Sequence, residues 1–163
     1  MAQVVIADAG PLLALAKLDH LHLLEQLFGV VLVPEAVYCE CLAKSGLDSQ
    51  RIQQAIDNQQ LRIIVETTED TAKVKLSRSL GDGEQAAIRL ALQQAASLLI
   101  LDDQLARKQA AKLGLAFIGV VRLLVIAEQH QLLASAEQAV DDLQQAGYRV
   151  SLEILQRVYA CKD

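Results

Sequence analysis

Short aliphatic runs recur along the chain, and each is followed by a stretch with a different apolar spacing. The run Leu98-Leu99-Ile100-Leu101 is the clearest, and it stops at two adjacent aspartates. Runs of this length are too short to span a membrane and are typical of strands buried on both faces. Five such runs predict strands at 3–7, 30–33, 61–65, 98–101 and 115–118.

Between these runs, apolar residues recur at three- and four-residue intervals, which predicts helices. Pro11 and Pro34 favour helix starts, and Gly29, Gly114 and Gly147 favour helix ends. The expected helices cover 11–18, 20–28, 34–42, 48–58, 83–96, 105–113, 120–129, 136–145 and 151–160, and 67–83 is the least regular part. Alternating strands and helices predict an α/β fold with a parallel sheet, and we expect a single domain over 1–163.

The composition narrows the class of protein. With 163 residues and 53% hydrophobic content, the chain can bury the core of one domain. Aromatic residues make up only 3%, which argues against binding single-stranded nucleic acid mainly by stacking. Three cysteines are an odd number and argue against a disulfide framework. Without a signal-like N-terminus or a membrane-length apolar run, we expect a cytoplasmic protein that does not enter the membrane.

Two of the predicted strands end in acidic residues. Asp8 follows the first strand, and Asp102 and Asp103 follow the fourth. Taken alone, Asp102 is best explained as the N-cap of the helix that comes after it. If the two strands are neighbours where the chain direction reverses, however, their carboxylates face one crevice at the carboxyl edge of the sheet.

Three further acids lie in or next to predicted helices. Glu40 lies near the middle of the helix that Pro34 opens. Asp82 is predicted to cap the helix 83–96, with Gln85 completing a capping box. Glu84 falls in the first turn of that helix, where the helix dipole favours a negative charge. Each of these residues also has an ordinary structural explanation, so the case for a site depends on their convergence.

Converging carboxylates require protons or a cation, and oxygen-only ligands suit Mg²⁺ or Mn²⁺. Such ions support phosphoryl transfer and hydrolysis. The sequence has no glycine-rich phosphate loop of the G-x-x-x-x-G-K type and no arrangement for a serine nucleophile. We therefore expect a metal site formed from Asp8, Glu84, Asp102 and Asp103, with Glu40 as a further catalytic residue. A metal-dependent phosphohydrolase other than a nuclease stays open as an alternative.

Four segments together resemble the motifs of PIN-domain proteins. The first two are Asp8-Ala9-Gly10-Pro11-Leu12-Leu13-Ala14-Leu15 and Val33-Pro34-Glu35-Ala36-Val37-Tyr38-Cys39-Glu40. The later two are Gly81-Asp82-Gly83-Glu84-Gln85-Ala86-Ala87-Ile88-Arg89-Leu90-Ala91 and Leu101-Asp102-Asp103-Gln104-Leu105-Ala106-Arg107. Their order and spacing are similar to a prokaryotic branch close to the VapC-type toxins, and the resemblance covers nearly the whole chain.

The resemblance implies a Rossmann-like three-layer fold and a Mg²⁺- or Mn²⁺-dependent ribonuclease. Carried over, the pocket acids are Asp8, Glu40, Glu84 and either Asp102 or Asp103. It also implies a homodimer and a toxin silenced by a small antitoxin protein. The chain departs from the family at Gly10, where a hydroxyl residue or Asn is common, and after Gly119, where only the first glycine of Gly-Thr-x-Gly is kept.

The net charge of −5 opposes binding to RNA, yet the acids are unevenly distributed. Without the six candidate acids, the chain carries a formal net charge of +1. Local basic residues could then contact RNA, and we expect these to be Lys73, Lys75, Arg78 and Arg107. The other possibility is a PIN-like module that has lost activity and serves to bind a partner protein.

Overall fold

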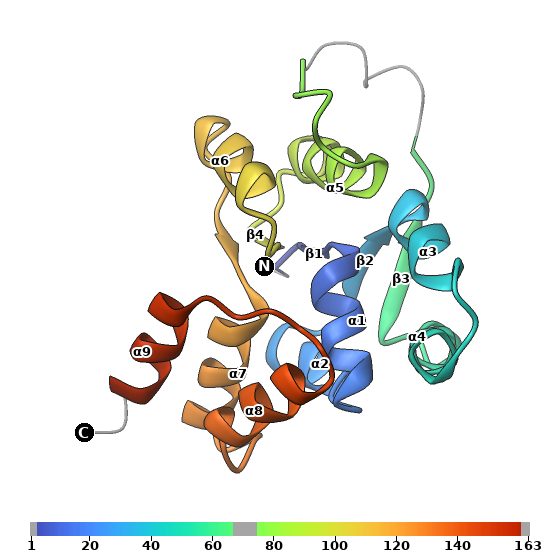
Figure 1. Ribbon diagram of the computed structural model, residues 1–163. Helices are drawn as coiled ribbons and strands as arrows, with labels where there is room; N and C mark the ends of the chain where they lie inside the picture. The colour runs from blue at the N-terminus through green and yellow to red at the C-terminus, as the bar shows by residue number, and fades with distance from the viewer. Residues whose placement is uncertain (1–2, 67–74, 161–163) are drawn as a thin grey trace.

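The computed structural model describes residues 3–66 and 75–160, and within them it contains a five-stranded, all-parallel sheet (Figure 1). The strands are β1 (Val5–Ala7), β2 (Val31–Pro34), β3 (Leu61–Ile64), β4 (Leu98–Ile100) and β5 (Phe117–Ile118). They lie in the order β3-β2-β1-β4-β5. The predicted α/β class with a parallel sheet is confirmed. Several strands are shorter than predicted, because pairing ends before the apolar run does.

The helices that connect these strands agree with the predicted ones to within a few residues. They are α1 (Ala9–Lys17), α2 (His22–Phe28), α3 (Glu35–Leu42), α4 (Leu47–Asp57), α5 (Asp82–Gln93), α6 (Gln104–Lys112), α7 (Val120–Gln129), α8 (Ala136–Gln145) and α9 (Leu152–Ala160). The helix-start positions predicted for the two prolines were wrong. Helix α1 begins at Ala9, directly after Asp8, so Pro11 is its third residue. Pro34 ends β2 and occupies the N-cap position of α3.

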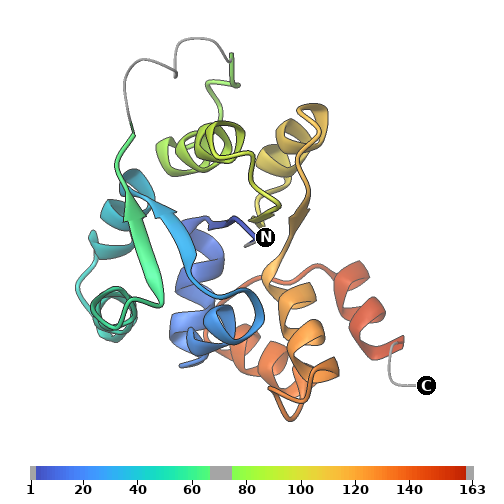
Figure 2. The same cartoon turned by 180° about the vertical axis from the view of Figure 1, so that it is seen from behind.

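The direction of the chain through the sheet reverses between β1 and β4. From β1 the chain moves outward through β2 to β3, and β4 then returns to the other side of β1. Figure 2 shows β3 beside β2 at one edge of the sheet. In the central pair, Ala7 is in register with Ile100, and the Asp8 amide donates to the Ile100 carbonyl at 3.0 Å. The two strands that end in aspartate are therefore neighbours at the switch point, where ligands bind in open α/β sheets.

Alternation along the strands divides the core into two layers. Val5, Ala7 and Ile100 point to the face covered by α1, α7 and α8, whereas Ile6 and Leu99 point to α5 and α6. In Figure 1, α5 and α6 lie above the strands, and α1, α2, α7 and α8 lie below them. Because successive side chains of a strand face opposite sides, burial of both sets requires helices on both faces. This is the three-layer arrangement that the resemblance implied.

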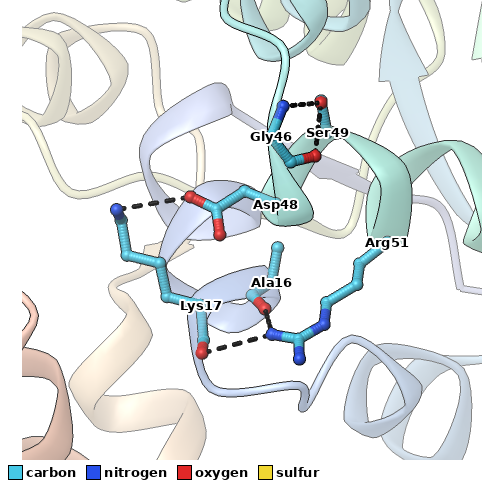
Figure 3. A network of polar contacts seen from close by, with 6 residues as sticks. All are labelled: Ala16, Lys17, Gly46, Asp48, Ser49 and Arg51. Carbon is cyan, nitrogen blue, oxygen red and sulfur yellow. Dashed lines mark hydrogen bonds and ion pairs between the residues drawn. The ribbon is translucent and has the colours of Figure 1, made fainter.

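A polar network fixes the helix that follows Asp8 (Figure 3). The Arg51 guanidinium of α4 donates to the Ala16 carbonyl at 2.7 Å, and Lys17 forms an ion pair with Asp48 at 3.3 Å. The Ser49 hydroxyl accepts from the Gly46 amide at 3.0 Å at the start of α4. The last turn of α1 is thereby attached to α4. With its far end held, α1 keeps a fixed orientation at the edge where Asp8 lies.

Two further observations bear on the expectations from sequence. Within the irregular segment 67–83, residues 75–81 form neither helix nor strand, and Asp82 and Gly83 begin α5. Lys73 lies outside the described residues. In the part of the chain that the structure describes, none of the helices is both long enough and apolar enough to cross a bilayer.

Candidate acidic site

Asp8 is a buried carboxylate with an unsatisfied oxygen. It follows β1 directly, its residue is 5% exposed, and its Oδ1 has no hydrogen-bond partner among the described residues. Burial raises the pKa of Asp8 to about 7; Glu84, Glu40 and Asp102 add to the rise, and the Ala9 amide opposes it. Three acids from three other segments are thus close enough to act on Asp8 electrostatically. Asp102, which was expected at this edge because it follows the neighbouring strand, is one of the three.

Glu40 reaches Asp8 across the first turn of α5. A Cβ placed on Gly83 would lie 2.5 Å from Glu40 Oε2 and 3.6 Å from Asp8 Oδ1. Glycine at 83 therefore leaves the space between the two carboxylates open. Burial raises the pKa of Glu40, and the Glu84 and Asp82 carboxylates raise it further. The sequence pattern did not identify Gly83, because its role is to make room for Glu40, which comes from the distant helix α3.

Two of these acids, Glu40 and Asp8, also act electrostatically on Cys41 of α3. Cys41 is buried, with 2% of the residue exposed. Burial, then Glu40 and Asp8, raise its pKa to about 12. A thiol of this kind is not a nucleophile at neutral pH. Cys41 belongs to the core, and Glu40 is the acid that acts on both Cys41 and Asp8.

Glu84 is held by the backbone at the start of α5. Its Oε2 accepts from the Gly81 amide at 2.8 Å, and Gly81 is the N-cap residue. The predicted cap formed by Asp82 and Gln85 was wrong by one residue, since the helix begins at Asp82. The side-chain amide of Gln85 instead donates to the Leu80 carbonyl at 2.9 Å. Glu84 thus caps its own helix while its charge faces Asp8.

Asp102 and Asp103 have different roles. Asp103 is exposed and is the N-cap of α6, with its Oδ2 accepting from the Ala106 amide at 2.9 Å. The explanation of Asp102 as the N-cap was therefore wrong, because the helix begins at Gln104 and Asp103 occupies the cap position. Asp102 turns toward the sheet edge, where its Oδ1 accepts from the Val120 amide at 3.0 Å. Of the two aspartates, Asp102 is the one that contributes to the field at Asp8.

Two side chains hold Asp102: Tyr148, which the sequence pattern did not identify, and Arg107, which was expected to contact RNA. The Tyr148 hydroxyl donates to Asp102 Oδ2, and the Arg107 guanidinium lies 3.8 Å from Oδ1. Burial and the Asp102 charge raise the pKa of Tyr148, so that the hydroxyl keeps its proton. Arg107 pairs with Asp102 rather than with Asp103 four residues before it, since its Nε is bound to the Leu101 carbonyl at 2.7 Å. Tyr148 is distant in sequence and carries no local signal.

The donor set fits a hard divalent cation in its chemistry. All four converging groups are carboxylates, and the unsatisfied Asp8 Oδ1 is a free acceptor next to Glu40. Across 3–66 and 75–160, however, no three His, Cys, Asp or Glu side chains are already arranged as a ligand set. Glu84 and Asp102 are bound to donors of the protein itself. Asp8, with its unsatisfied Oδ1, is therefore the acid most ready to take a cation.

The expected RNA contacts lie at different places around this edge. Lys75 and Arg78 are exposed on the segment that leads into α5. Arg107 lies beside Asp102. Their contact with RNA stays a prediction.

A family model described as a PIN domain matches residues 4–161. The chain belongs to the PIN-domain family. A solved structure of the PIN domain of T. brucei RRP44 is similar to this one, with a TM-score of 0.52 and 15% identity, over 80% of this chain and 84% of that one. The similarity shows a shared fold. None of the curated proteins matches the chain in sequence. PIN domains are generally nucleases that need a metal ion.

The buried Asp8 of this PIN domain predicts a pH dependence of stability. The unfolded chain ionises near the usual pKa of 3.8, whereas the folded protein keeps the proton up to about pH 7. Stability should therefore fall as the pH rises from about 4 to 7, by up to about 4 kcal/mol, and then level off. The Asp8→Asn variant should not lose stability in this way, because the asparagine side chain does not ionise. In chemical denaturation with a chelator present, it should match the wild type near pH 4 and be more stable at pH 8.

The control for that comparison is Glu25→Gln, which removes an exposed carboxylate on α2. This variant should follow the wild-type curve throughout. If Asp8→Asn is no more stable than the wild type at pH 8, the carboxylate of Asp8 is not the destabilising charge inferred here.

A pair of glycines tests how closely Asp102 and Arg107 are packed. A Cβ on Gly119 would lie 2.5 Å from Asp102 Oδ1 and would also meet the Arg107 guanidinium. Gly119→Ala should cost about 1–3 kcal/mol of unfolding free energy because both side chains are fixed by hydrogen bonds. Gly10→Ala, in α1, meets no atom within 4 Å and should instead stabilise by up to about 1 kcal/mol. Equal melting temperatures for both variants would contradict the packing at Gly119.

Proposed function

We propose that this PIN domain is a Mg²⁺- or Mn²⁺-dependent endoribonuclease. The observation that carries the proposal is Asp8, buried at the switch point with an unsatisfied oxygen and facing three further acids. Such an arrangement is costly unless a proton or a cation compensates it. The family supplies the reaction class, since PIN domains are generally nucleases.

Asp8, Glu84 and Asp102 would hold the cation, and Glu40 would contribute from the side of α3. A bound divalent ion supplies an activated water and offsets charge on the phosphate. Asp103 is not part of this set, because its carboxylate caps α6. Tyr148 and the Val120 amide orient Asp102 by occupying one oxygen each.

The residues of the chain also suggest how a substrate would be placed. Glu40 is more exposed than Asp8 and can accept a hydrogen bond from the attacking water, which orients it. The Arg107 guanidinium lies beside Asp102 and can donate to a phosphate oxygen. Lys75 and Arg78 extend the positive charge along the same edge. Lys73, two residues before Lys75 in the sequence, is a further predicted RNA contact. RNA binding that depends on these cations would weaken as salt increases.

We further propose that the protein is the toxin of a toxin–antitoxin pair and forms a homodimer. The support is the resemblance of the four motifs to the VapC-type branch. Exposed apolar side chains agree with partner binding: Leu47, Val65 and Leu152 are 57%, 65% and 72% exposed. A small antitoxin protein would silence such an enzyme in its cell.

One observation favours a second function. Glu84 and Asp102 are already bound to donors of the protein, and no ligand set is preformed within the described residues. A PIN-like module that binds a partner without catalysis could keep this arrangement. The two experiments below separate the alternatives.

Metal binding is tested by thermal unfolding at pH 7.5. Millimolar Mn²⁺ should raise the melting temperature of the wild type by about 3 °C or more, because a ligand that binds only the folded state stabilises it. Asp8→Asn should abolish most of this rise, and Glu25→Gln should retain it. A wild-type melting curve that Mn²⁺ leaves unchanged would favour the non-catalytic module.

Cleavage is tested on single-stranded RNA with Mn²⁺, using three variants that each replace an aspartate by asparagine. Asp8→Asn and Asp102→Asn should each reduce the cleavage rate by about a hundredfold or more. The reason is that electrostatic stabilisation of the charge that develops in the transition state is usually the largest contribution to catalysis. Asp103→Asn should cleave normally, because asparagine also serves as an N-cap. Cleavage that survives in the first two variants, or in EDTA, would assign the activity to another site or a contaminant.

A further inference from the structure

A pocket of about 460 Å³ adjoins the acidic site on the side of β5, and Asp102 is part of its wall. It is formed by the end of β5, the first turns of α7 and the inner side of α9. Figure 1 shows α9 beside α7, away from α1. The volume lies in the range of pockets that bind small molecules. Through Asp102, the pocket is continuous with the acidic edge described above.

The charge of the pocket is opposite to that of the chain. Arg107, Arg122 and Arg157 line it, against a single carboxylate, Asp102. Arg122 is exposed, and no hydrogen bond or ion pair of its guanidinium is recorded within 3–66 and 75–160. Arg157 pairs with Glu153 of the same helix at 2.9 Å, and both are largely exposed. In a protein with a net charge of −5, this local excess of arginine favours an anionic ligand.

The remaining wall is apolar. Val121 and Val125 of α7 face Ile154 and Val158 of α9 across the pocket. The Arg107 guanidinium lies over the Phe117 ring, 5.4 Å from its centroid, so it presents a flat surface. Bases of single-stranded RNA stack on arginine planes as well as on aromatic rings. The ligand that suits this pocket therefore combines an anionic group with a flat, weakly polar one.

We propose that this pocket is a subsite for one nucleotide of a single-stranded RNA, next to the phosphate that is cleaved. Arg122 and Arg157 bind its phosphate, and its base lies between the aliphatic wall and Arg107. The assignment of this nucleotide to a substrate rests on the proposed ribonuclease function. The binding itself does not require cleavage or a metal, and can be measured without either.

Binding is tested with a short fluorescein-labelled single-stranded RNA in EDTA, by fluorescence anisotropy. Arg122→Ala and Arg157→Ala should each weaken binding about tenfold, because each removes a charge-assisted hydrogen bond. Each should also lower the dependence of log K on log salt by about one. The matched control is Arg62→Ala, which removes an exposed arginine from β3 at the opposite edge of the sheet. Its binding should equal that of the wild type.

Location and ligand class are tested by NMR titration of the wild type. A nucleoside 5′-monophosphate should shift the methyl signals of Val121, Val125 and Ile154, whereas inorganic phosphate should leave these methyls largely unmoved. Two results would overturn the proposal: RNA binding that both arginine variants retain, or methyl shifts produced by an acidic peptide but not by the nucleotide. The second would identify a peptide site.

The outcomes for the two proposals remain distinct. If the wild type cleaves RNA but the arginine variants bind RNA normally, the proposed subsite is wrong and the proposed ribonuclease function is retained. If RNA binding depends on Arg122 and Arg157 but Mn²⁺ produces no cleavage, the subsite stands and the catalytic proposal fails.

Discussion

The structure depends on how a buried carboxylate is tolerated at the centre of the sheet. β1 has neighbours on both sides and helices on both faces, so the residue that ends it is removed from water. That residue is Asp8, and burial alone is the largest cause of its raised pKa. A carboxylate in such a place either keeps a proton or binds a cation. Because the pKa of Asp8 is about 7, the protonated and ionised forms are close in free energy at neutral pH. A cation that binds Asp8 with only modest affinity can then displace the proton.

The four acids around this position fall into two groups. Glu84 and Asp102 are bound to backbone amides at the starts of α5 and α7, which offsets part of their charge. Asp8 Oδ1, by contrast, has no hydrogen-bond donor among the described residues, and Glu40 Oε2 lies beside it at Gly83. The helix starts thus hold two acids in place, and the residual negative field is concentrated on the other two. Stability and cation affinity are opposed here, because the field that destabilises the metal-free protein is the one that attracts the ion.

The sequence was sufficient for the fold class because strand and helix periods differ. The buried strands appear as uninterrupted aliphatic runs, and their acidic ends are visible without a structure. Strand order was not available, since it depends on crossovers between distant segments. The adjacency of Asp8 and Asp102 therefore had to be a conditional prediction. The choice between Asp102 and Asp103 was also out of reach, because it turns on a one-residue shift in the start of α6.

The residues that the pattern missed share a physical property. Tyr148 and Gly83 act on side chains that lie 46 and 43 or more positions away in sequence, so no local spacing records them. Gly119 was noticed only as a family glycine, whereas its role is to admit Asp102 and Arg107. By contrast, the caps at Asp103 and Gly81 follow from local chemistry, and the errors there were of one residue. Long-range contacts at the sheet edge, not local propensity, define this site.

Arg107 connects the acidic edge to the basic pocket. Its Nε binds the Leu101 carbonyl at the end of β4, and its guanidinium lies between Asp102 and the Phe117 ring. One side of this group therefore faces the carboxylates, and the other lines a pocket with two more arginines. In the proposed nucleotide subsite, a phosphate that approaches along the pocket would meet positive charge first and the acidic cluster last. An acidic protein can in this way accept a polyanion, because the sign of the local field along the path matters more than the net charge.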